Sequence, residues 1–490
     1  MSFLTAPTSV WVRSIIIIPL LAVTEIVRLF NRYYTFHDML LVCGDFLLVI
    51  AASGAVRFLL EDGVLSGQES SDFTLHVLVM AFVVVIAFYY SDLYAIDQSL
   101  SLRELLERFV SGLGAACIVI GIVSYPIPKF GKSVYFGEMV ALGFCLYLWR
   151  LSFMRVIRQA GARVKVLIVG MRNIGKMVAE ELCAHQKLGM DVIGFVGQQT
   201  GCVTLSHGNP KKIEIPTFAP PSLTGLIATT GVGRILLAGA DPCHQSYFQD
   251  LVVIKAMGIP VEDCHSFYER LASKIAVTDL PPEWIALSAG FRRDRFILAV
   301  KRTIDIFASF LGLLFSVPIM LLAAAAIKIE SGGPIFYQQE RIGQNDRRFV
   351  LYKFRSMTKD AEAKMGPVWA SEGDPRVTRV GAIMRKARVD EIPQMINVLK
   401  GEMSFVGPRP ERPFFVERLK QNIPYYDLRH SVKPGITGWA QISYPYGDSE
   451  QDAVEKLQYD LYYIKHMSPI FDLQIIFESL KVILLGSGAR

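Results

Sequence analysis

The chain has 490 residues, of which 52% are hydrophobic, so it is too long for one ordinary domain and too apolar for a soluble one. The formal net charge of +6 is a mild excess, much of it beside apolar runs where Lys and Arg are typical membrane flanks, and we expect no nucleic-acid partner. Seven scattered cysteines without a C-x-x-C pattern argue against a disulfide framework or a zinc site.

Residues 1–160 form the first predicted domain, a four-helix transmembrane bundle. Each of four apolar runs approaches the roughly 17–25 residues that a helix needs to cross a bilayer. The runs are His37–Val56, Thr74–Tyr90, Phe109–Tyr125 and Val134–Trp149. Basic residues gather before the first run, between the second and third, and after the fourth. This asymmetry predicts four spans with both ends in the cytoplasm.

Residues 161–290 form the second predicted domain, an α/β Rossmann-like cytoplasmic module. Strands and helices alternate there, which predicts a doubly wound sheet, with strands at 164–170, 191–196 and 234–238 and a helix at 174–184. A dinucleotide fingerprint needs a glycine between Gly170 and Gly175, where Arg172 stands instead. We therefore expect a regulatory or dimerising module, with a homodimer possible, rather than an NAD site. Arg172 could still contact an anion at the helix N-terminus.

The third predicted domain, residues 295–490, follows a linker at Pro281–Asp294 and is mainly α-helical. Its apolar run Ile306–Ile327 is long enough to span, but Pro318 near the middle predicts a kink. If this run crossed the bilayer, the basic residues after it would face outside. We therefore expect a re-entrant membrane helix, with Ser316 as a donor to the freed carbonyls. A kinked spanning helix is the alternative.

Two adjacent carboxylates, Asp390 and Glu391, stand among basic residues and precede the rigid sequence Pro408-Arg409-Pro410. A carboxylate can attack phosphorus, its neighbour can hold a divalent cation, and guanidinium groups can grip phosphate oxygens, so the pattern suits metal-assisted phosphoryl transfer. Taken alone, such a pair is more often an exposed helix face, and it is the surrounding sequence that favours the catalytic interpretation. On a continuous helix, Arg385 would point away from the side chains of the Asp390–Glu391 dyad, but this long side chain need only reach phosphate oxygens beyond them. A structural salt bridge is the alternative for Arg409.

From about Lys301 onward, the chain resembles the bacterial sugar transferase family, the polyprenyl-phosphate hexose-1-phosphate transferases. The motifs that carry the resemblance occur in a dense order. They are Lys301–Asp305, Gly333–Gly343, Tyr352–Met357, Asp390–Gln394, Asn397–Gly401, Met403–Pro410 and Lys433–Gln441. The four-span region and the degenerate Rossmann-like module also resemble the large, multi-domain members, which initiate exopolysaccharide synthesis.

The resemblance implies a reaction and the residues that perform it. A UDP-hexose, with glucose or galactose preferred, gives its sugar-1-phosphate to undecaprenyl phosphate beside membrane lipid of the bacterial inner membrane, on its cytoplasmic face, and UMP leaves. Asp390 matches the family's nucleophile and Glu391 its metal ligand, and Asp390 can share the Mg²⁺ with Glu391. Arg385 and Arg409 match phosphate-binding arginines, and Lys353 matches a basic position near the same pocket.

Further interpretations remain open at this point. Lys301, Arg302 and Arg341 are interpreted as membrane-surface cations, each worth about 1 kcal/mol near anionic lipid. The segment Ile470–Leu485 either lies flat on the membrane or packs on the core. A membrane-bound nucleotide-sugar dehydratase or epimerase would need a second, NAD-binding domain with an intact glycine-rich turn, which residues 295–490 lack. A non-enzymatic scaffold for polysaccharide export predicts no role for the dyad.

Overall fold

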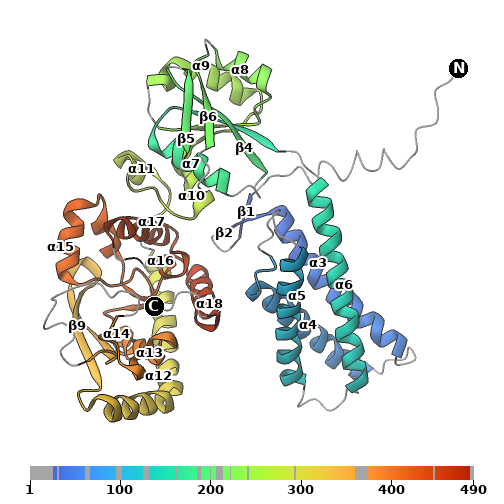
Figure 1. The fold of residues 1–490 in the computed structure, drawn as a ribbon, viewed down its shortest axis with the longest axis vertical. Coiled ribbons are helices and arrows are strands. Elements are labelled where there is room, and N and C mark those ends of the chain that lie inside the picture. The colour runs from blue at the N-terminus through green and yellow to red at the C-terminus, as the bar shows by residue number, and fades with distance from the viewer. Residues whose placement is uncertain are drawn as a thin grey trace. The chain divides into compact units, whose positions relative to one another are not determined.

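The structure is a computed structural model that describes residues 26–29, 32–60, 67–94, 102–124, 132–159, 163–184, 189–198, 200–205, 213–220, 222–239, 242–291, 294–358, 374–444, 447 and 449–485. The chain divides into two compact units. The first contains Met1–Leu29, Tyr33–Met171 and Val178–Val261, and the second contains Phe30–Arg32, Arg172–Met177 and Glu262–Arg490. Figure 1 colours the chain from its blue N-terminus to its red C-terminus. The predicted domain division at 160 and 290–295 stays a prediction.

Four long helices of the first unit lie where the apolar runs were predicted, after a small two-stranded sheet of β1 (Ile26–Leu29) and β2 (Arg32–Thr35). They are α3 (Phe36–Leu60), α4 (Gly67–Tyr90), α5 (Leu102–Ser124) and α6 (Lys132–Gln159). Helix α3 packs against α4 and α6, and α4 packs against α5. Between α3 and α6, the fully buried Arg150 pairs with the fully buried Asp45. A lone buried charge would be costly, so this ion pair fixes the two helices to each other.

Two helices of the described residues are long and apolar enough to cross a membrane, namely Leu102–Ile122 within α5 and Arg295–Ser331 in the second unit. The apolar stretches Met39–Ala55 and Thr74–Tyr90 are shorter.

The Rossmann-like module is built on a mixed six-stranded sheet with strand order β5-β6-β4-β3-β7-β8. Strand β3 pairs in parallel with β4 and β7, whereas β5 runs antiparallel to β6. Residues Val166–Val169 of β3 are completely buried, as expected for a central strand covered on both faces. The predicted strands and helix are confirmed. The elements are β3 (Val164–Val169), α7 (Asn173–Ala184), β4 (Met190–Val196), β5 (Gly201–Leu205), β6 (Ile213–Phe218), α8 (Leu223–Thr230), β7 (Arg234–Leu237), α9 (Pro242–Ala256) and β8 (Val261–Asp263).

The first turn of α7 holds an anion that the chain supplies itself. The carboxylate of Asp279 accepts a hydrogen bond from the Ile174 backbone N–H at 3.0 Å and another from the Arg172 guanidinium at 3.1 Å. Backbone N–H groups at a helix N-terminus favour negative charge, which is why a carboxylate is stable there. Arg172 therefore does contact an anion at this turn.

The second unit begins with residues that were predicted to belong to the module or to a linker. Helix α10 (Cys264–Ala272) leads to an extended segment in which Ile275, Val277 and Leu280 enter the same buried core as Trp439. The predicted linker Pro281–Asp294 contains helix α11 (Pro282–Leu287), and Trp284 of α11 packs against this core. This part of the chain is thus folded structure and not only a connection.

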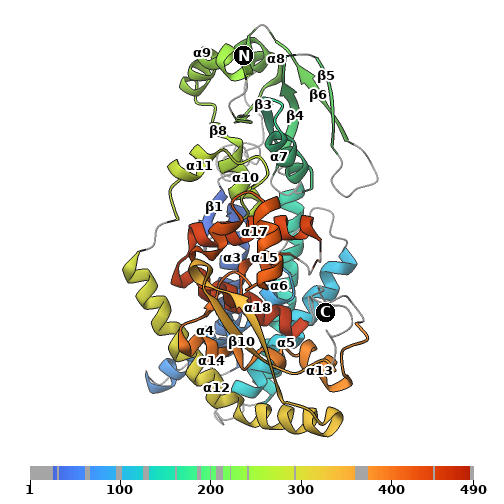
Figure 2. The same cartoon turned by 90° about the vertical axis from the view of Figure 1, so that its left-hand side faces the viewer.

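Helix α12 (Arg295–Ser331) is 37 residues long, and Pro318 lies inside it. Figures 1 and 2 show that the helix is bent, with its later part turned away from the direction of its first part. Proline removes one backbone hydrogen bond and crowds the preceding turn, so a bend is the expected consequence. Ser316 forms no hydrogen bond with any of the described residues, and its role as a donor stays a prediction.

The first part of α12 carries buried polar side chains that attach it to the rest of the unit. The Lys301 ammonium donates to the Asp472 carboxylate at 2.6 Å and to the Val406 carbonyl at 2.9 Å. The Asp305 carboxylate accepts from the Phe405 backbone N–H at 2.9 Å. The interpretation of Lys301 as a membrane-surface cation is therefore wrong, because its side chain is 10% exposed and already paired.

The two other predicted membrane-surface cations also have protein partners. Arg302 donates to the carbonyls of Val398 and Leu399, in the last turn of helix α14 (Gln394–Lys400), at 2.6 and 2.8 Å. Arg341 donates to the Gln339 side chain at 2.6 Å, and its own side chain is 16% exposed. Both arginines thus serve the internal structure of the unit.

The remaining elements of the second unit are mostly helical. The hairpin of β9 and β10 is antiparallel, and β11 pairs in parallel with β12. One face of α18 buries Phe471 and Ile475, while Ile470 and Leu473 stay exposed, so this helix packs on the core and still presents an apolar face. The elements are β9 (Phe336–Ile342), η3 (Gln344–Asp346), β10 (Arg348–Phe354), α13 (Arg379–Lys386), η4 (Val389–Glu391), α14 (Gln394–Lys400), β11 (Ser404–Val406), α15 (Pro413–Asn422), η5 (Tyr426–Ser431), β12 (Gly435–Thr437), α16 (Trp439–Ser443), α17 (Glu450–His466) and α18 (Pro469–Leu485).

Candidate active site

Asp390 and Glu391 lie on a short 3₁₀ turn, η4, which follows the end of helix α13. Helix α13 ends at Lys386, and Arg388 adopts φ 56° and ψ 18°, the left-handed region. The chain then turns through η4, and Asp390 and Glu391 are each only 7% exposed. The exposed-helix-face alternative is therefore wrong.

Arg385 acts on the dyad through its charge. Its Nε donates to the Ser356 hydroxyl at 3.0 Å, and its charge acts to lower the pKa of Asp390. The prediction that Arg385 points away assumed an unbroken helix through Asp390, and the left-handed residue Arg388 removes that assumption.

Glu391 is held by three cations that come from different parts of the unit. Its Oε1 lies 2.9 Å from the Arg409 guanidinium and 3.2 Å from the Lys353 ammonium. Its Oε2 lies 3.5 Å from the Arg388 guanidinium. Burial alone would raise the pKa of this carboxyl, but Arg409, Lys353 and Arg388 together hold the pKa of Glu391 well below its usual range. Glu391 is therefore ionised at all physiological pH values.

Asp390 is in the opposite electrostatic situation. Burial and the neighbouring Glu391 charge raise the pKa of Asp390, although Lys353, Arg385 and Arg409 oppose this rise. Among the described residues, none forms a hydrogen bond or ion pair with the Asp390 carboxylate. A carboxylate without a partner in a buried site is less stabilised and more reactive than a paired one. The two neighbours therefore differ, because three cations neutralise Glu391, whereas none of the described residues pairs with Asp390.

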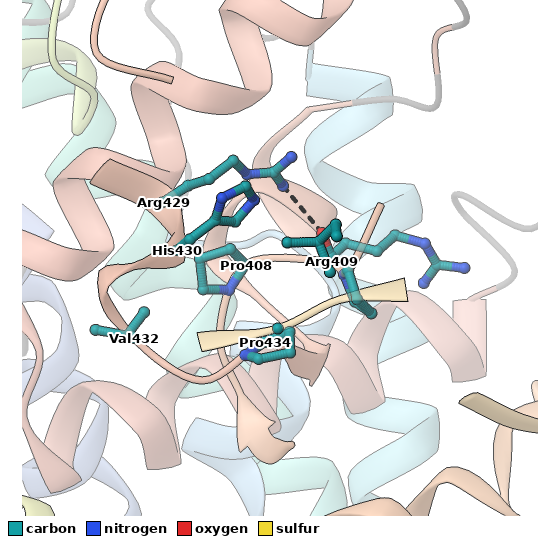
Figure 3. A pocket seen from close by; sticks show the side chains of 9 residues that line it. Pro408, Arg409, Arg429, His430, Val432 and Pro434 are labelled. Carbon is teal, nitrogen blue, oxygen red and sulfur yellow. Dashed lines mark hydrogen bonds between the residues drawn. The ribbon is translucent and has the colours of Figure 1, made fainter. Parts of the chain in front are cut away.

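The buried guanidinium of Arg429 holds the backbone of the loop that carries Arg409. Arg429 donates to the carbonyl oxygen of Arg409 at 2.9 Å and to the Asp460 carboxylate at 3.0 Å. Burial raises the pKa of Asp460 to about 6, and the paired Arg429 guanidinium opposes this rise. Figure 3 shows the small pocket that Pro408, Arg409 and Arg429 help to line, with the Arg409 side chain pointing out of it. The loop thereby aims Arg409 toward Glu391 (2.9 Å) while its backbone is held.

The structure brings together the predicted site residues Lys353, Arg385, Asp390, Glu391 and Arg409. Lys353 is on β10. Burial lowers the pKa of the Lys353 ammonium group, and the nearby Glu391 carboxylate partly offsets this lowering. Pro318 and Ser316 are on α12, outside this group of contacts.

Sequence reasoning missed two basic residues, Arg388 and Arg429. A cation two positions before Asp390 was a visible signal for Arg388. Arg429 had none, because its role depends on Asp460, which is 31 positions away.

The carboxylate oxygens of Asp390 and Glu391 are not equally available to a divalent cation. Both Glu391 oxygens face cations, whereas the Asp390 oxygens meet none of the described side chains within ion-pair distance. Magnesium in phosphate-transfer sites is often bound by one or two carboxylates plus substrate phosphates and water, and this donor set fits that pattern if a cation leaves Glu391.

A second acidic group, Asp346 with Asp427 and His430, also has metal-ligand spacing. There the Lys420 ammonium lies 3.0 Å from Asp346 and 2.5 Å from Asp427, so a protein cation already neutralises it.

Comparison with known proteins gives a family for this arrangement. The family described as "Bacterial sugar transferase" matches residues 296–486. A UDP-N-acetylgalactosamine-undecaprenyl-phosphate N-acetylgalactosaminephosphotransferase of Aeromonas hydrophila is 47% identical over 232 residues, which cover 47% of this chain and 54% of that protein. This chain thus spans about half the length of that relative.

Two further relatives are matched over most of their length. An undecaprenyl-phosphate glucose phosphotransferase of Komagataeibacter xylinus is 30% identical over 409 residues, covering 78% of this chain and 71% of that protein. The galactosyl transferase CpsE of Streptococcus agalactiae is 31% identical over 448 residues, covering 86% and 95%. Because the family match contains the whole dyad site and two relatives align along most of both chains, this chain belongs to the bacterial sugar transferase family.

Proposed function

We propose that this chain transfers a hexose-1-phosphate from a UDP-sugar to undecaprenyl phosphate, releases UMP, and so initiates the synthesis of a surface polysaccharide. The observation that carries the proposal is the contrast within the dyad. Asp390 is buried and has no partner among the described residues, beside a Glu391 that three cations hold. The names of the relatives supply the acceptor, undecaprenyl phosphate, and a sugar donor.

The proposed reaction has two displacements at one phosphorus. In the first, an oxygen of Asp390 attacks the β-phosphorus of the UDP-sugar, a new O–P bond forms, the bond to the bridging oxygen breaks, and UMP leaves. In the second, an oxygen of the lipid phosphate attacks the same phosphorus and releases Asp390. Both substrates are anions, and using them in turn avoids placing them in the site together.

The cations around Glu391 can support both displacements. Arg409 and Lys353 lie on the Glu391 Oε1 side, at 2.9 and 3.2 Å, and both also act on Asp390. Long basic side chains that are held this close to the nucleophile can turn to the diphosphate oxygens when the donor binds. Stabilising charge that develops on departing phosphate oxygens is a large contribution in phosphoryl transfer.

We propose Mg²⁺ as the cofactor. Asp390 and Glu391 would hold it together with donor phosphate oxygens. When bound, it would neutralise phosphate charge and act as a Lewis acid. The fit requires that a basic side chain release Glu391.

We also propose that the enzyme is a multi-pass protein of the bacterial inner membrane, with α3–α6 crossing the bilayer and the catalytic unit on the cytoplasmic side. Helix α12 would enter the membrane, bend at Pro318 and return on the same side. Its exposed apolar side chains support this, among them Phe307, Phe310, Phe315 and Leu322. The exposed apolar face of α18, with Ile470 and Leu473, would lie at the membrane surface.

UMP release provides the test. The purified protein in lipid nanodiscs, with Mg²⁺ and undecaprenyl phosphate, is offered a panel of UDP-sugars that includes glucose, galactose and their N-acetylated forms. The wild type should release UMP from one or a few of them. Asp390→Asn should fold, with an unchanged or higher thermal midpoint because a buried charge is removed, and should release none. Turnover near that of the wild type in this variant would end the proposal.

A covalent intermediate provides a second readout. Without the lipid acceptor, donor labelled in its sugar should leave label on the wild-type protein and none on Asp390→Asn. Release of UMP without any trapped label would mean direct transfer in one step instead. Ultraviolet absorbance of NAD in the purified protein would favour the dehydratase alternative.

A further inference from the structure

Arg388 occupies a backbone position that does not favour arginine. Its φ of 56° and ψ of 18° lie in the left-handed region. Residues other than glycine, asparagine and aspartate are disfavoured there, because their Cβ atom crowds the backbone. Glycine would allow the same turn with less strain, so the backbone alone gives no reason for an arginine. Strained residues of this kind gather where a side chain is needed for function.

The guanidinium of Arg388 is the loosest of the three cations on Glu391. It lies 3.5 Å from Oε2, while Lys353 and Arg409 lie 3.2 and 2.9 Å from Oε1. Its side chain is 29% exposed, against 20% for Lys353 and 26% for Arg409. The pair is long and Arg388 is partly open to solvent, so a phosphate, which carries more charge than a carboxylate, can compete with Glu391 for this guanidinium.

We propose, resting on the function proposed above, that Arg388 binds the β-phosphate of the nucleotide sugar. The phosphorus that Asp390 attacks must approach its carboxylate to roughly 3–3.5 Å. Arg388 precedes Asp390 by two residues and already reaches the adjacent Glu391. Its guanidinium exchanges Oε2 of Glu391 for oxygens of this phosphate, which it can grip with two N–H groups. The exchange frees one oxygen of Glu391 when the donor arrives.

A comparison of UDP with UMP tests this assignment, because the two ligands differ by the β-phosphate. Binding is measured by titration calorimetry on the full chain in nanodiscs with Mg²⁺. Arg388→Gly removes the guanidinium and suits the left-handed backbone. We expect it to bind UDP about 10–100-fold more weakly, the size of a lost charge-assisted hydrogen bond, and UMP within about twofold of the wild type.

Two further variants separate charge from geometry. Arg388→Lys keeps the charge without the two-pronged grip and should lie between the wild type and Arg388→Gly in UDP affinity. Lys386→Gln makes a matched charge change at an exposed basic residue of the same segment and should leave both affinities unchanged. The thermal midpoint of Arg388→Gly should equal or exceed that of the wild type, because the strained backbone relaxes.

The role of Arg388 would be overturned if Arg388→Gly lost UDP and UMP affinity equally, with or without a lowered thermal midpoint. It would also be overturned if the variant lost affinity for neither ligand. These results are separate from a failure of the proposed function. That failure would appear as a wild type that releases no UMP from any UDP-sugar in the panel, or as an active Asp390→Asn.

Discussion

Lys301→Met should lower the temperature at which the second unit unfolds by a large amount. Its ammonium lies 2.6 Å from Asp472, and the two side chains are only 10% and 7% exposed. Removing one partner of a buried ion pair leaves an unpaired buried charge, at about 3–5 kcal/mol. A lysine that merely touched anionic lipid would contribute about 1 kcal/mol. For a unit of this size, the buried-pair value corresponds to a fall of roughly 6–20 °C in the thermal midpoint.

The assay is thermal unfolding of the full chain in nanodiscs at one fixed lipid composition. Lys328→Met is the control, since Lys328 is an exposed lysine of the same helix, and it should change the midpoint by no more than about 2 °C. The double variant Lys301→Met with Asp472→Leu should recover much of the loss, because a buried pair replaced by apolar groups is often neutral. A change of less than about 2 °C in Lys301→Met, or losses that simply add in the double variant, would refute the reasoning.

Three other perturbations test the site and the bent helix. Arg429→Met should lower stability by about 3–5 kcal/mol in a thermal or denaturant assay, because the buried Asp460 loses its partner, and stability equal to that of the wild type would contradict the buried network. In Lys353→Met, the residual rate of UMP release should fall at a higher pH than in the wild type. Asp390 must be ionised to attack, its pKa is already raised, and the variant removes a cation that lowers that pKa. An acidic limb that stays in place or moves to lower pH would show that Lys353 does not act on Asp390. Pro318→Ala restores a backbone donor and lets α12 straighten, so a cysteine placed at the C-terminal end of α12 should become accessible to a membrane-impermeant reagent from the opposite side of the bilayer. Labelling from the same side in both proteins would show that the proline is not what turns the helix.

The site residues were predictable where chemistry and local sequence coincide. Asp390 and Glu391 are adjacent, and Arg409 stands in a rigid loop just beyond them, so their chemistry could be recognised in one short stretch. The position of Arg385 could not be predicted, because it depends on the left-handed backbone of Arg388. A left-handed position is usually indicated by a glycine or an asparagine, and here the residue is an arginine. Basic residues favour helices, and the sequence gives no local reason to end one there.

Long-range pairing explains the other differences from the sequence-based expectations. Lys301 opens an apolar helix, which is the usual place of a membrane-flanking cation, but its partner Asp472 is 171 positions away. The segment with Trp284 has the prolines of a linker, yet that side chain packs against a core formed much later in the chain. Hydrophobic periodicity did locate α12 and the central strands, because those signals are local.

The buried segment with Ile275, Val277 and Leu280 has a practical consequence for the smallest piece of this chain that can stand alone. A chain that begins at residue 295, just before the family match at 296, would lack these three side chains and leave the space they fill beside Trp439 empty. Fully burying an aliphatic side chain is worth about 1.5–3 kcal/mol, so the loss would be several times that of an ordinary point mutation. An autonomous fragment should therefore begin upstream of residue 262, and a shorter one would aggregate through the uncovered aromatic surface.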